Sequence, residues 1–313
     1  MNLPLVDISN WKRDDEFSIY PYGARDKLLV ISPAGSSPII KGNFRYLFKK
    51  SNKRYPWQFW NEVIAYHIGM LIGVNVPKAF PAINSSGNEC GALIEWFLDM
   101  PSILVHGGDL MKNINEAYDM QKGKQHNFED IISICKALQL VNMLTKDWEK
   151  YWVKVLCFDA IIGNTDRHHN NWGLIFRKGN HEIMFSPAFD NGTALGYEIL
   201  DKNLSKFDDL SYMDHYINKG QHHMKWDKKK DMSMVRGEIH LDMLKLLCHF
   251  FPNGKKWMLE IIPNEDILHQ LDVLLNNYRD YKITVPLTIE RQNFVMKLLR
   301  RRTELISILL AKL

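Results

Sequence analysis

The sequence predicts an α+β protein of two lobes, in which a small α/β lobe is followed by a larger, mainly helical lobe containing one inserted β-hairpin. Three observations support this prediction. The first hundred residues mix short apolar runs with turn signals, the remainder has long stretches of helical periodicity, and two short apolar runs interrupt those helices. We expect the lobes to span residues 1–99 and 100–313, with the connection near residues 99–108.

Apolar runs that follow turn residues predict strands in the first lobe, over residues 26–32, 44–49 and 91–98. Residues 57–73 are expected to form a helix, because their apolar side chains recur at helical spacing. The same spacing predicts helices in the second lobe, over residues 131–144, 148–162, 241–251, 267–278 and 289–310. Residues 172–177 and 183–186 form the predicted hairpin, with a turn signal at residues 178–181.

Composition limits the class of protein. The chain has 313 residues, 46% hydrophobic and 24% charged, which is an ordinary globular balance, and its net charge of +4 disfavours direct nucleic-acid binding or a membrane-surface role. The four cysteines form no CxxC pair, so we expect reduced thiols in a cytoplasmic protein. No apolar run approaches the roughly 18 residues of a membrane-spanning helix, and the N-terminal residues do not resemble a secretion signal.

Residues 163–172 are the most informative stretch for function, because this polar segment lies between an apolar helix and an apolar strand. The hairpin brings Asn171, before its first strand, and Asp190, after its second strand, to the same end. An amide oxygen and a carboxylate together suit Mg²⁺ beside phosphates. Asp166, five residues before Asn171, would stand opposite as the base for an incoming hydroxyl, so the pattern predicts phosphoryl transfer.

Two other interpretations of this stretch remain open. Asn, Asp and Gly also form ordinary turns, and the two loops could contain nothing more. His168 and His169 could instead bind a transition metal, although adjacent histidines in an irregular loop rarely point at one ion.

Glu62 is the only formally charged residue between Arg54 and Lys78, on a predicted helix that is apolar nearly all round. A buried carboxylate needs a cation, and Lys49 at the end of the preceding strand is the expected partner. Lys50 is the alternative lysine, and strand alternation allows only one of the two to face the cleft. Alternatively, Glu62 reaches solvent at a helix end.

These motifs together resemble the HipA family of bacterial kinases, in its short form without an extra N-terminal subdomain. The matching segments are the catalytic loop at residues 163–173 (GNTDRHHNNWG), the metal-binding segment at 189–192 (FDNG), the phosphate loop at 23–27 (GARDK), the lysine strand at 46–49 (YLFK), the helix glutamate at 61–62 (NE) and the hinge strand at 92–97 (ALIEWF). The phosphate loop is the least specific of them.

The resemblance implies a bilobal protein-kinase-like fold. It also implies that Asp166 is the catalytic base, that His168 supports the catalytic loop, and that Asn171 and Asp190 bind Mg²⁺. The residues expected to hold ATP are Gly23, Ala24, Arg25, Lys27, Lys49, Glu62, Glu95 and Phe97.

The resemblance implies transfer of the ATP γ-phosphate to Ser or Thr of a protein. It also leaves open three expectations: a translation-related substrate, an antitoxin or activator partner, and a role as a toxin or secreted effector. Three positions depart from the family's pattern. Tyr20 and Tyr22, with Ser18 nearby, replace regulatory serines. Asn170 replaces a basic side chain, so we expect Arg167 or Lys27 to contact phosphate.

Other functions remain alternatives. Phosphoinositide or small-molecule kinases use a similar loop, nucleotidyl transfer is compatible with the same fold, and a regulatory module could bind nucleotide without turnover. The basic residues 219–230 (KGQHHMKWDKKK) predict either a solvated loop or a docking strip for an acidic or RNA-bound substrate.

Overall fold

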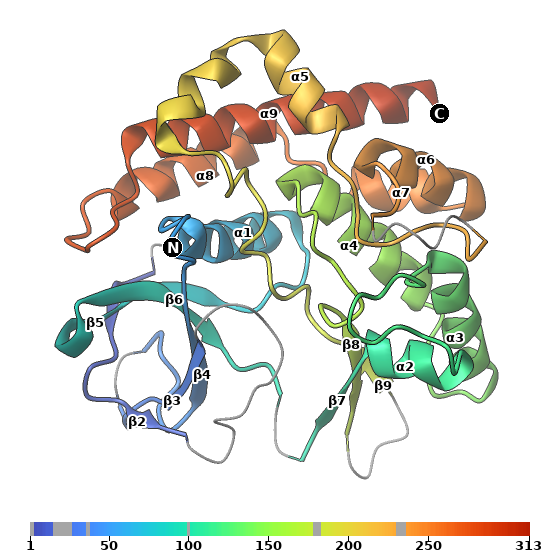
Figure 1. Cartoon of the computed structure of the whole chain (residues 1–313), viewed down its shortest axis with the longest axis horizontal. Coiled ribbons are helices and arrows are strands. Elements are labelled where there is room, and N and C mark those ends of the chain that lie inside the picture. The colour runs from blue at the N-terminus through green and yellow to red at the C-terminus, as the bar shows by residue number, and fades with distance from the viewer. Residues whose placement is uncertain (1–2, 15–26, 36–37, 99–100, 178–182, 230–235) are drawn as a thin grey trace.

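The computed structural model describes residues 3–14, 27–35, 38–98, 101–177, 183–229 and 236–313. It confirms the α+β class, with a sheet-based lobe beside a larger helical lobe (Figure 1). Among the described residues, no helix combines the length and the apolar character needed to cross a bilayer.

The first lobe is built on a curled sheet whose described strands lie in the order β1–β5–β6–β4–β3–β2. These strands are β1 (Val6–Asp7), β2 (Lys12–Arg13), β3 (Lys27–Ile31), β4 (Arg45–Lys50), β5 (Ala79–Asn84) and β6 (Glu89–Glu95). β4 pairs antiparallel with both β3 and β6. Lys27 lies directly opposite Lys49 in this register, so both cationic side chains project from the same face of the sheet.

Helix α1 (Gln58–Ile72) packs against β5 and β6 and is buried on nearly all sides. Its far side contacts the C-terminal part of the chain, because Trp60 Nε1 donates to the Val285 carbonyl at 3.0 Å and His67 hydrogen-bonds the Tyr278 hydroxyl at 2.5 Å. Glu62 is only 4% exposed. The alternative in which this carboxylate reaches solvent is therefore wrong.

The second lobe is mainly helical. Its described α-helices are α2 (Gly107–Ile114), α3 (Phe128–Leu140), α4 (Trp148–Ile162), α5 (Leu210–Asn218), α6 (His240–Phe250), α7 (Gly254–Leu259), α8 (Glu265–Tyr278) and α9 (Ile289–Lys312). Among the described residues, η2 (Ser85–Gly87) in the first lobe and η3 (Asp201–Asp208) in the second form 3₁₀ segments. Helix α4 is central and packs against α6, α7 and α9. It ends at Gly163, where the loop predicted to be catalytic begins.

The inserted hairpin is present as β8 (Gly173–Phe176) and β9 (Ile183–Phe185), and its predicted turn lies outside the described residues. A third strand, β7 (Ile103–His106), pairs antiparallel with β8. The sequence alone predicts only a connection between the lobes for this segment. The expected boundary between residues 99 and 100 also falls outside the described ranges and stays a prediction.

The long elements agree closely with the expected ones, and α4 has the predicted bounds. Helix α3 is the exception, because it ends at Leu140 although the apolar pattern continues to residue 144. Asn142 adopts a left-handed φ of 56°, which stops the helix and turns the chain. The next residue, Met143, then accepts a hydrogen bond from Ile183 N at 2.9 Å at the start of β9.

Gly163 ends α4 in a left-handed conformation with φ 68°, and a Cβ there would lie 2.6 Å from the Arg302 guanidinium. Gly73 ends α1 with φ 71° and has no atom within 4 Å of an added Cβ.

We expect Gly73→Ala to cost about 1 kcal/mol of unfolding free energy through backbone strain alone. Gly163→Ala should cost about 3 kcal/mol because steric overlap is added. Urea denaturation of both variants tests this, and equal losses would contradict it.

Candidate active site

A cavity of about 620 Å³ lies between the two lobes. Its apolar wall includes Leu47, Ala79 and Ile94 from the sheet and Leu104 from β7. The cavity is also lined by most of the described residues that the sequence predicts for the site, namely Lys27, Lys49, Glu62, Glu95, Phe97, His168, Asn171 and Asp190. The remaining predicted nucleotide contacts, Gly23, Ala24 and Arg25, lie outside the described residues, as do Tyr20, Tyr22 and Ser18.

Lys49 forms two ion pairs at the polar end of the cavity. Its Nζ lies 2.6 Å from Glu62 Oε1 and 2.5 Å from Asp190 Oδ1, and the lysine side chain is only 3% exposed. The predicted pair between Lys49 and Glu62 is therefore present. Lys50 points to the other face of the sheet and pairs with Glu89 at 2.8 Å, which rules it out as the partner of Glu62.

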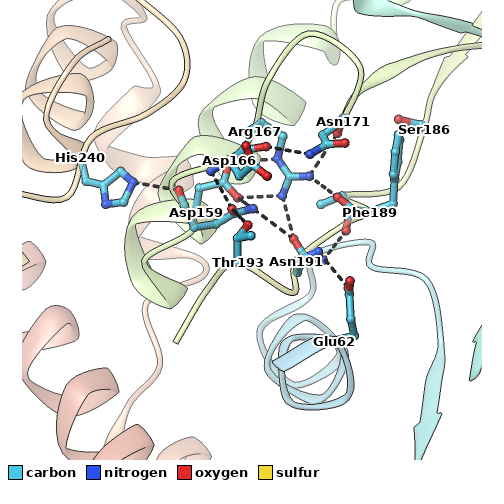
Figure 2. A network of polar contacts seen from close by, with 12 residues as sticks. Glu62, Asp159, Asp166, Arg167, Asn171, Ser186, Phe189, Asn191, Thr193 and His240 are labelled. Carbon is cyan, nitrogen blue, oxygen red and sulfur yellow. Dashed lines mark hydrogen bonds and ion pairs between the residues drawn. The ribbon is translucent and has the colours of Figure 1, made fainter. Parts of the chain in front are cut away.

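Arg167 is fully buried at the centre of a polar network (Figure 2). Its Nε donates to Asp159 Oδ2 at 3.0 Å and its Nη2 donates to Asp159 Oδ1 at 2.7 Å. This two-point geometry fixes the plane of the guanidinium group. Asp159 lies on α4 and is itself fully buried, so the pair connects the central helix to the catalytic loop.

The other donors of Arg167 reach both loops of the site. Nη1 donates to the carbonyl oxygens of Asn171, at 3.1 Å, and Phe189, and Nη2 donates to Asn191 Oδ1 at 2.9 Å. The expectation that Arg167 contacts phosphate is therefore wrong, because its guanidinium is used inside the protein and does not line the cavity. Lys27 does line the cavity and remains the described candidate for that contact.

Asp166 and Asn171 are held by the loop's own hydrogen bonds. Asp166 N donates to Asn164 Oδ1 at 3.0 Å, and Asn171 Nδ2 donates to the Asp166 carbonyl at 2.7 Å. His240 Nε2 donates to the Asn164 carbonyl at 2.9 Å from helix α6. Because its amide nitrogen is engaged, Oδ1 is the side-chain atom of Asn171 that could hold a cation. Asp166 is partly buried and lies beside the cavity lining rather than in it.

Asp190 adopts a left-handed backbone conformation with φ 58°, which is uncommon for a residue other than glycine. Both neighbouring residues are held by buried charged groups. The Phe189 carbonyl accepts from Arg167, and Asn191 N donates to Glu62 Oε2 at 2.8 Å. The carboxyl of Asp190 therefore faces Lys49 and the cavity because its backbone is fixed on both sides.

His168 lines the cavity, and its Nδ1 accepts a hydrogen bond from Asn170 N at 3.1 Å. Burial lowers the pKa of His168, although Asp190 opposes this. A neutral ring with Nδ1 accepting carries its proton on Nε2. His169 points elsewhere, toward the Met120 carbonyl at 3.2 Å, and the described residues contain no cluster of three or more metal-binding side chains of the His, Cys, Asp or Glu type. The transition-metal interpretation therefore has no support.

Neither Asp159 nor His106 is predicted from the sequence to belong to the site, and Asn191 is predicted only as part of the segment 189–192, without a role of its own. Asp159 had a recognisable signal, because it is the only formally charged residue between Lys154 and Asp166. His106, in the unpredicted strand β7, lines the cavity and its Nδ1 donates to the Asn170 carbonyl at 3.0 Å. Its position depends on the pairing of β7 with β8, which no local pattern indicates.

The basic segment is not a continuous docking strip in its described part, residues 219–229. Lys225 is 1% exposed, and its Nζ donates to the Lys124 carbonyl at 2.6 Å. Phe128 N, at the start of α3, donates to the Lys225 carbonyl at 2.8 Å. The segment is therefore part of the packed edge of the helical lobe, with Lys219, Lys228 and Lys229 at its surface.

Over residues 20–250 the chain matches the HipA-like C-terminal domain family, and it belongs to that family. Among curated proteins, it is 24% identical to the serine/threonine-protein kinase CtkA of Helicobacter pylori over 157 residues, which are 49% of this chain and 46% of CtkA. The chain thus aligns with less than half of that relative.

Solved structures share the fold, and two of them are similar over nearly the whole chain. The crystal structure of the proinflammatory kinase CtkA of Helicobacter pylori superposes with a TM-score of 0.76 and 19% identity, covering 99% of this chain and 98% of that one. HipA of Shewanella oneidensis MR-1, solved as a toxin–antitoxin complex with HipB and operator DNA, gives a TM-score of 0.56 and 15% identity, covering 94% of this chain and 66% of that one. The bilobal kinase fold is therefore confirmed.

We expect two buried histidines, His222 and His169, to make the stability of the protein depend on pH. Neither ring nitrogen of His222 has a hydrogen-bond partner among the described residues, and its ring lies 4.4 Å from that of His240. Burial lowers the pKa of His222 to about 3 and that of His169 to about 4. Both groups bind protons more readily in the unfolded chain, so their stabilising effect is complete above pH 6.5 and is lost as pH falls toward those values.

We expect His222 to contribute a loss of about 2 kcal/mol in unfolding free energy between pH 7 and pH 5. His222→Phe should reduce that pH dependence, and His269→Gln on the exposed face of α8 should not. Urea denaturation at both pH values measures it. An unchanged pH dependence in His222→Phe would contradict the assignment.

Proposed function

We propose that this protein is an ATP- and magnesium-dependent kinase that transfers the γ-phosphate of ATP to Ser or Thr of a protein substrate. The observation that carries the proposal is the convergence of Lys49, Glu62, Asn171 and Asp190 on one cavity with Asp166 beside it. Those residue types, in that arrangement, are what phosphoryl transfer on a kinase fold requires.

The cavity has the polarity that ATP needs. Its inner wall is apolar and is formed by Leu47, Ala79 and Ile94, with Glu95 and Phe97 at the connection between the lobes. An adenine ring fits between such side chains, with the backbone of the connection as its polar contact. The opposite end contains Lys27 and Lys49, which would bind the phosphates.

The polar end also fits a hard divalent cation. Asn171 Oδ1 and the Asp190 carboxylate are oxygen donors on the same cavity, and a site with so few protein ligands suits Mg²⁺, which retains water and phosphate oxygens. Bound magnesium would neutralise charge on the ATP phosphates. The protein would orient these two oxygen donors, and Glu62 would hold Lys49 beside them.

Asp166 would act as the general base. Asp166 is not among the residues that line the cavity, but its backbone carbonyl accepts a hydrogen bond from Asn171, which does line it. It would accept the proton of the Ser or Thr hydroxyl as the phosphoryl group transfers. A neutral His168, which lines the cavity and accepts from Asn170 N at Nδ1, would support the loop.

A protein is the proposed acceptor because the relative CtkA is named a serine/threonine-protein kinase. By the same reasoning we propose an antitoxin or activator partner, a translation-related substrate, a toxin or secreted effector role and a cytoplasmic location. HipB is named in the complex of the Shewanella protein and is not assigned to this chain. A phosphoinositide or small-molecule kinase is the alternative. A regulatory module without turnover is disfavoured by the complete set of Lys49, Asp166, Asn171 and Asp190.

Asp166→Asn should lower phosphoryl transfer by at least about a hundredfold, because the variant cannot accept the hydroxyl proton. The assay incubates purified protein with γ-labelled ATP, Mg²⁺ and a cell lysate, followed by mass spectrometry of modified proteins. Asp280→Asn, at an exposed position, serves as the control. Transfer from α-labelled ATP would indicate nucleotidyl transfer instead, and label in lipids would support the alternative acceptor.

Lys49→Met should weaken ATP binding by about tenfold or more, because a charge-assisted contact to phosphate is lost. Lys50→Met is a matched control, since the two lysines are neighbours in β4 and face opposite sides of the sheet. Calorimetric titration with ATP and Mg²⁺ gives both affinities. Equal affinities in the two variants would remove Lys49 from the nucleotide site.

A further inference from the structure

Arg167 does not line the cavity, yet it contacts the backbone at both proposed metal ligands. One nitrogen, Nη1, donates to the carbonyl of Asn171 itself and to the carbonyl of Phe189, the residue before Asp190. Asn171 and Asp190 belong to different loops, before β8 and after β9. A single buried atom therefore connects the two loops that carry the ligands (Figure 2).

The guanidinium group of Arg167 cannot shift easily to accommodate a different distance between the two loops. Its fork to Asp159 fixes the plane, and Asp159 is anchored in the central helix α4. Asn164 Nδ2 donates to the same carboxylate at 3.2 Å. Because Arg167 and Asp159 are both fully buried, water cannot replace a hydrogen bond that is lost. The N–H groups of Arg167 that do not bond Asp159 therefore keep a fixed direction.

The second loop needs such a restraint because Asp190 is in the left-handed region. The left-handed backbone conformation is strained for a residue other than glycine, and it persists only when its surroundings hold it. Arg167 holds the peptide before Asp190 and Glu62 holds the peptide after it. Without the first contact, the carboxylate would be free to rotate away from Asn171.

We infer that Arg167 is a positioning residue that sets the separation and orientation of Asn171 and Asp190 for one divalent cation. This inference rests on the proposed function, and it extends that function by assigning the geometry of the metal site to a residue that contacts neither metal nor nucleotide. Asp159 orients Arg167 through their ion pair and therefore takes part in the same positioning role.

Arg302 provides a matched control. It is also almost fully buried, at 3% exposure, and its Nη1 donates to the Ala160 carbonyl of the same helix α4 at 3.2 Å. No hydrogen bond of the described structure connects Arg302 to Asn171 or to Phe189. Replacing either arginine by lysine puts a smaller cationic group at a buried position next to α4. Only Arg167→Lys removes the link between the two loops that carry the proposed metal ligands.

The test measures how much Mn²⁺, as a probe for the divalent cation, strengthens binding of the non-hydrolysable analogue AMP-PNP. Calorimetric titrations with Mn²⁺ and with EDTA give the ratio of the two affinities for each protein. Arg167→Lys should reduce this ratio about tenfold or more, as expected when a residue that orients metal ligands is changed. Its affinity for metal-free AMP-PNP should stay within about twofold of wild type, since Arg167 touches no part of the nucleotide space.

Arg302→Lys should keep the wild-type ratio even if it lowers the melting temperature by a similar amount. An unchanged ratio in Arg167→Lys, or the same reduction in Arg302→Lys, overturns the inference and leaves the proposed function intact. If wild-type protein binds AMP-PNP equally with and without Mn²⁺, the metal part of the proposed function fails and the inference fails with it.

A second variant keeps the test decisive if Arg167→Lys does not fold. Asp159→Asn combined with Arg167→Gln removes both charges together, which avoids leaving one of them buried alone. Glutamine cannot reach the Asn171 and Phe189 carbonyls while also bonding residue 159 at two points. The double variant should therefore show the same loss of Mn²⁺ enhancement, and a wild-type ratio in it also overturns the inference.

Discussion

The buried ion pair of Arg167 and Asp159 is the interaction on which the geometry of the site depends. Removing two charges from water costs several kcal/mol per ion, and their mutual attraction offsets this only when the remaining donors are also satisfied. Here the carbonyls of Asn171 and Phe189 and the side chain of Asn191 supply those partners. The cost of burial therefore makes the arrangement specific, because any displacement of either loop leaves a charged donor without its acceptor.

Much of the candidate site could be predicted because a lone charge in an apolar stretch is informative. This argument identified Glu62 and its partner Lys49, and the same argument applied to Asp159 would have found the partner of Arg167. The direction of a side chain in an irregular loop could not be predicted. Arg167 follows Asp166 directly, yet it points into the protein, because a carboxylate on α4 attracts it more strongly than solvent does.

The long helices and the hairpin were predictable, since their apolar periodicity extends over several turns. The short strands were not. β7 (Ile103–His106) has only four residues, and it becomes a strand by pairing with β8, which lies about seventy residues later. β1 (Val6–Asp7) depends in the same way on β5. Both are products of tertiary contacts, and His106 reaches the cavity only through one of them.

Helix α1 carries Glu62, and its opposite side is bound to Val285 and Tyr278 near the other end of the sequence. In kinases whose activity is controlled by displacement of the corresponding helix, that helix can swing away from the nucleotide lysine. Here such a swing would have to break buried hydrogen bonds to the C-terminal region. Residues more than two hundred positions later in the sequence therefore help to hold the helix that carries Glu62, and with it the ion pair between Glu62 and Lys49.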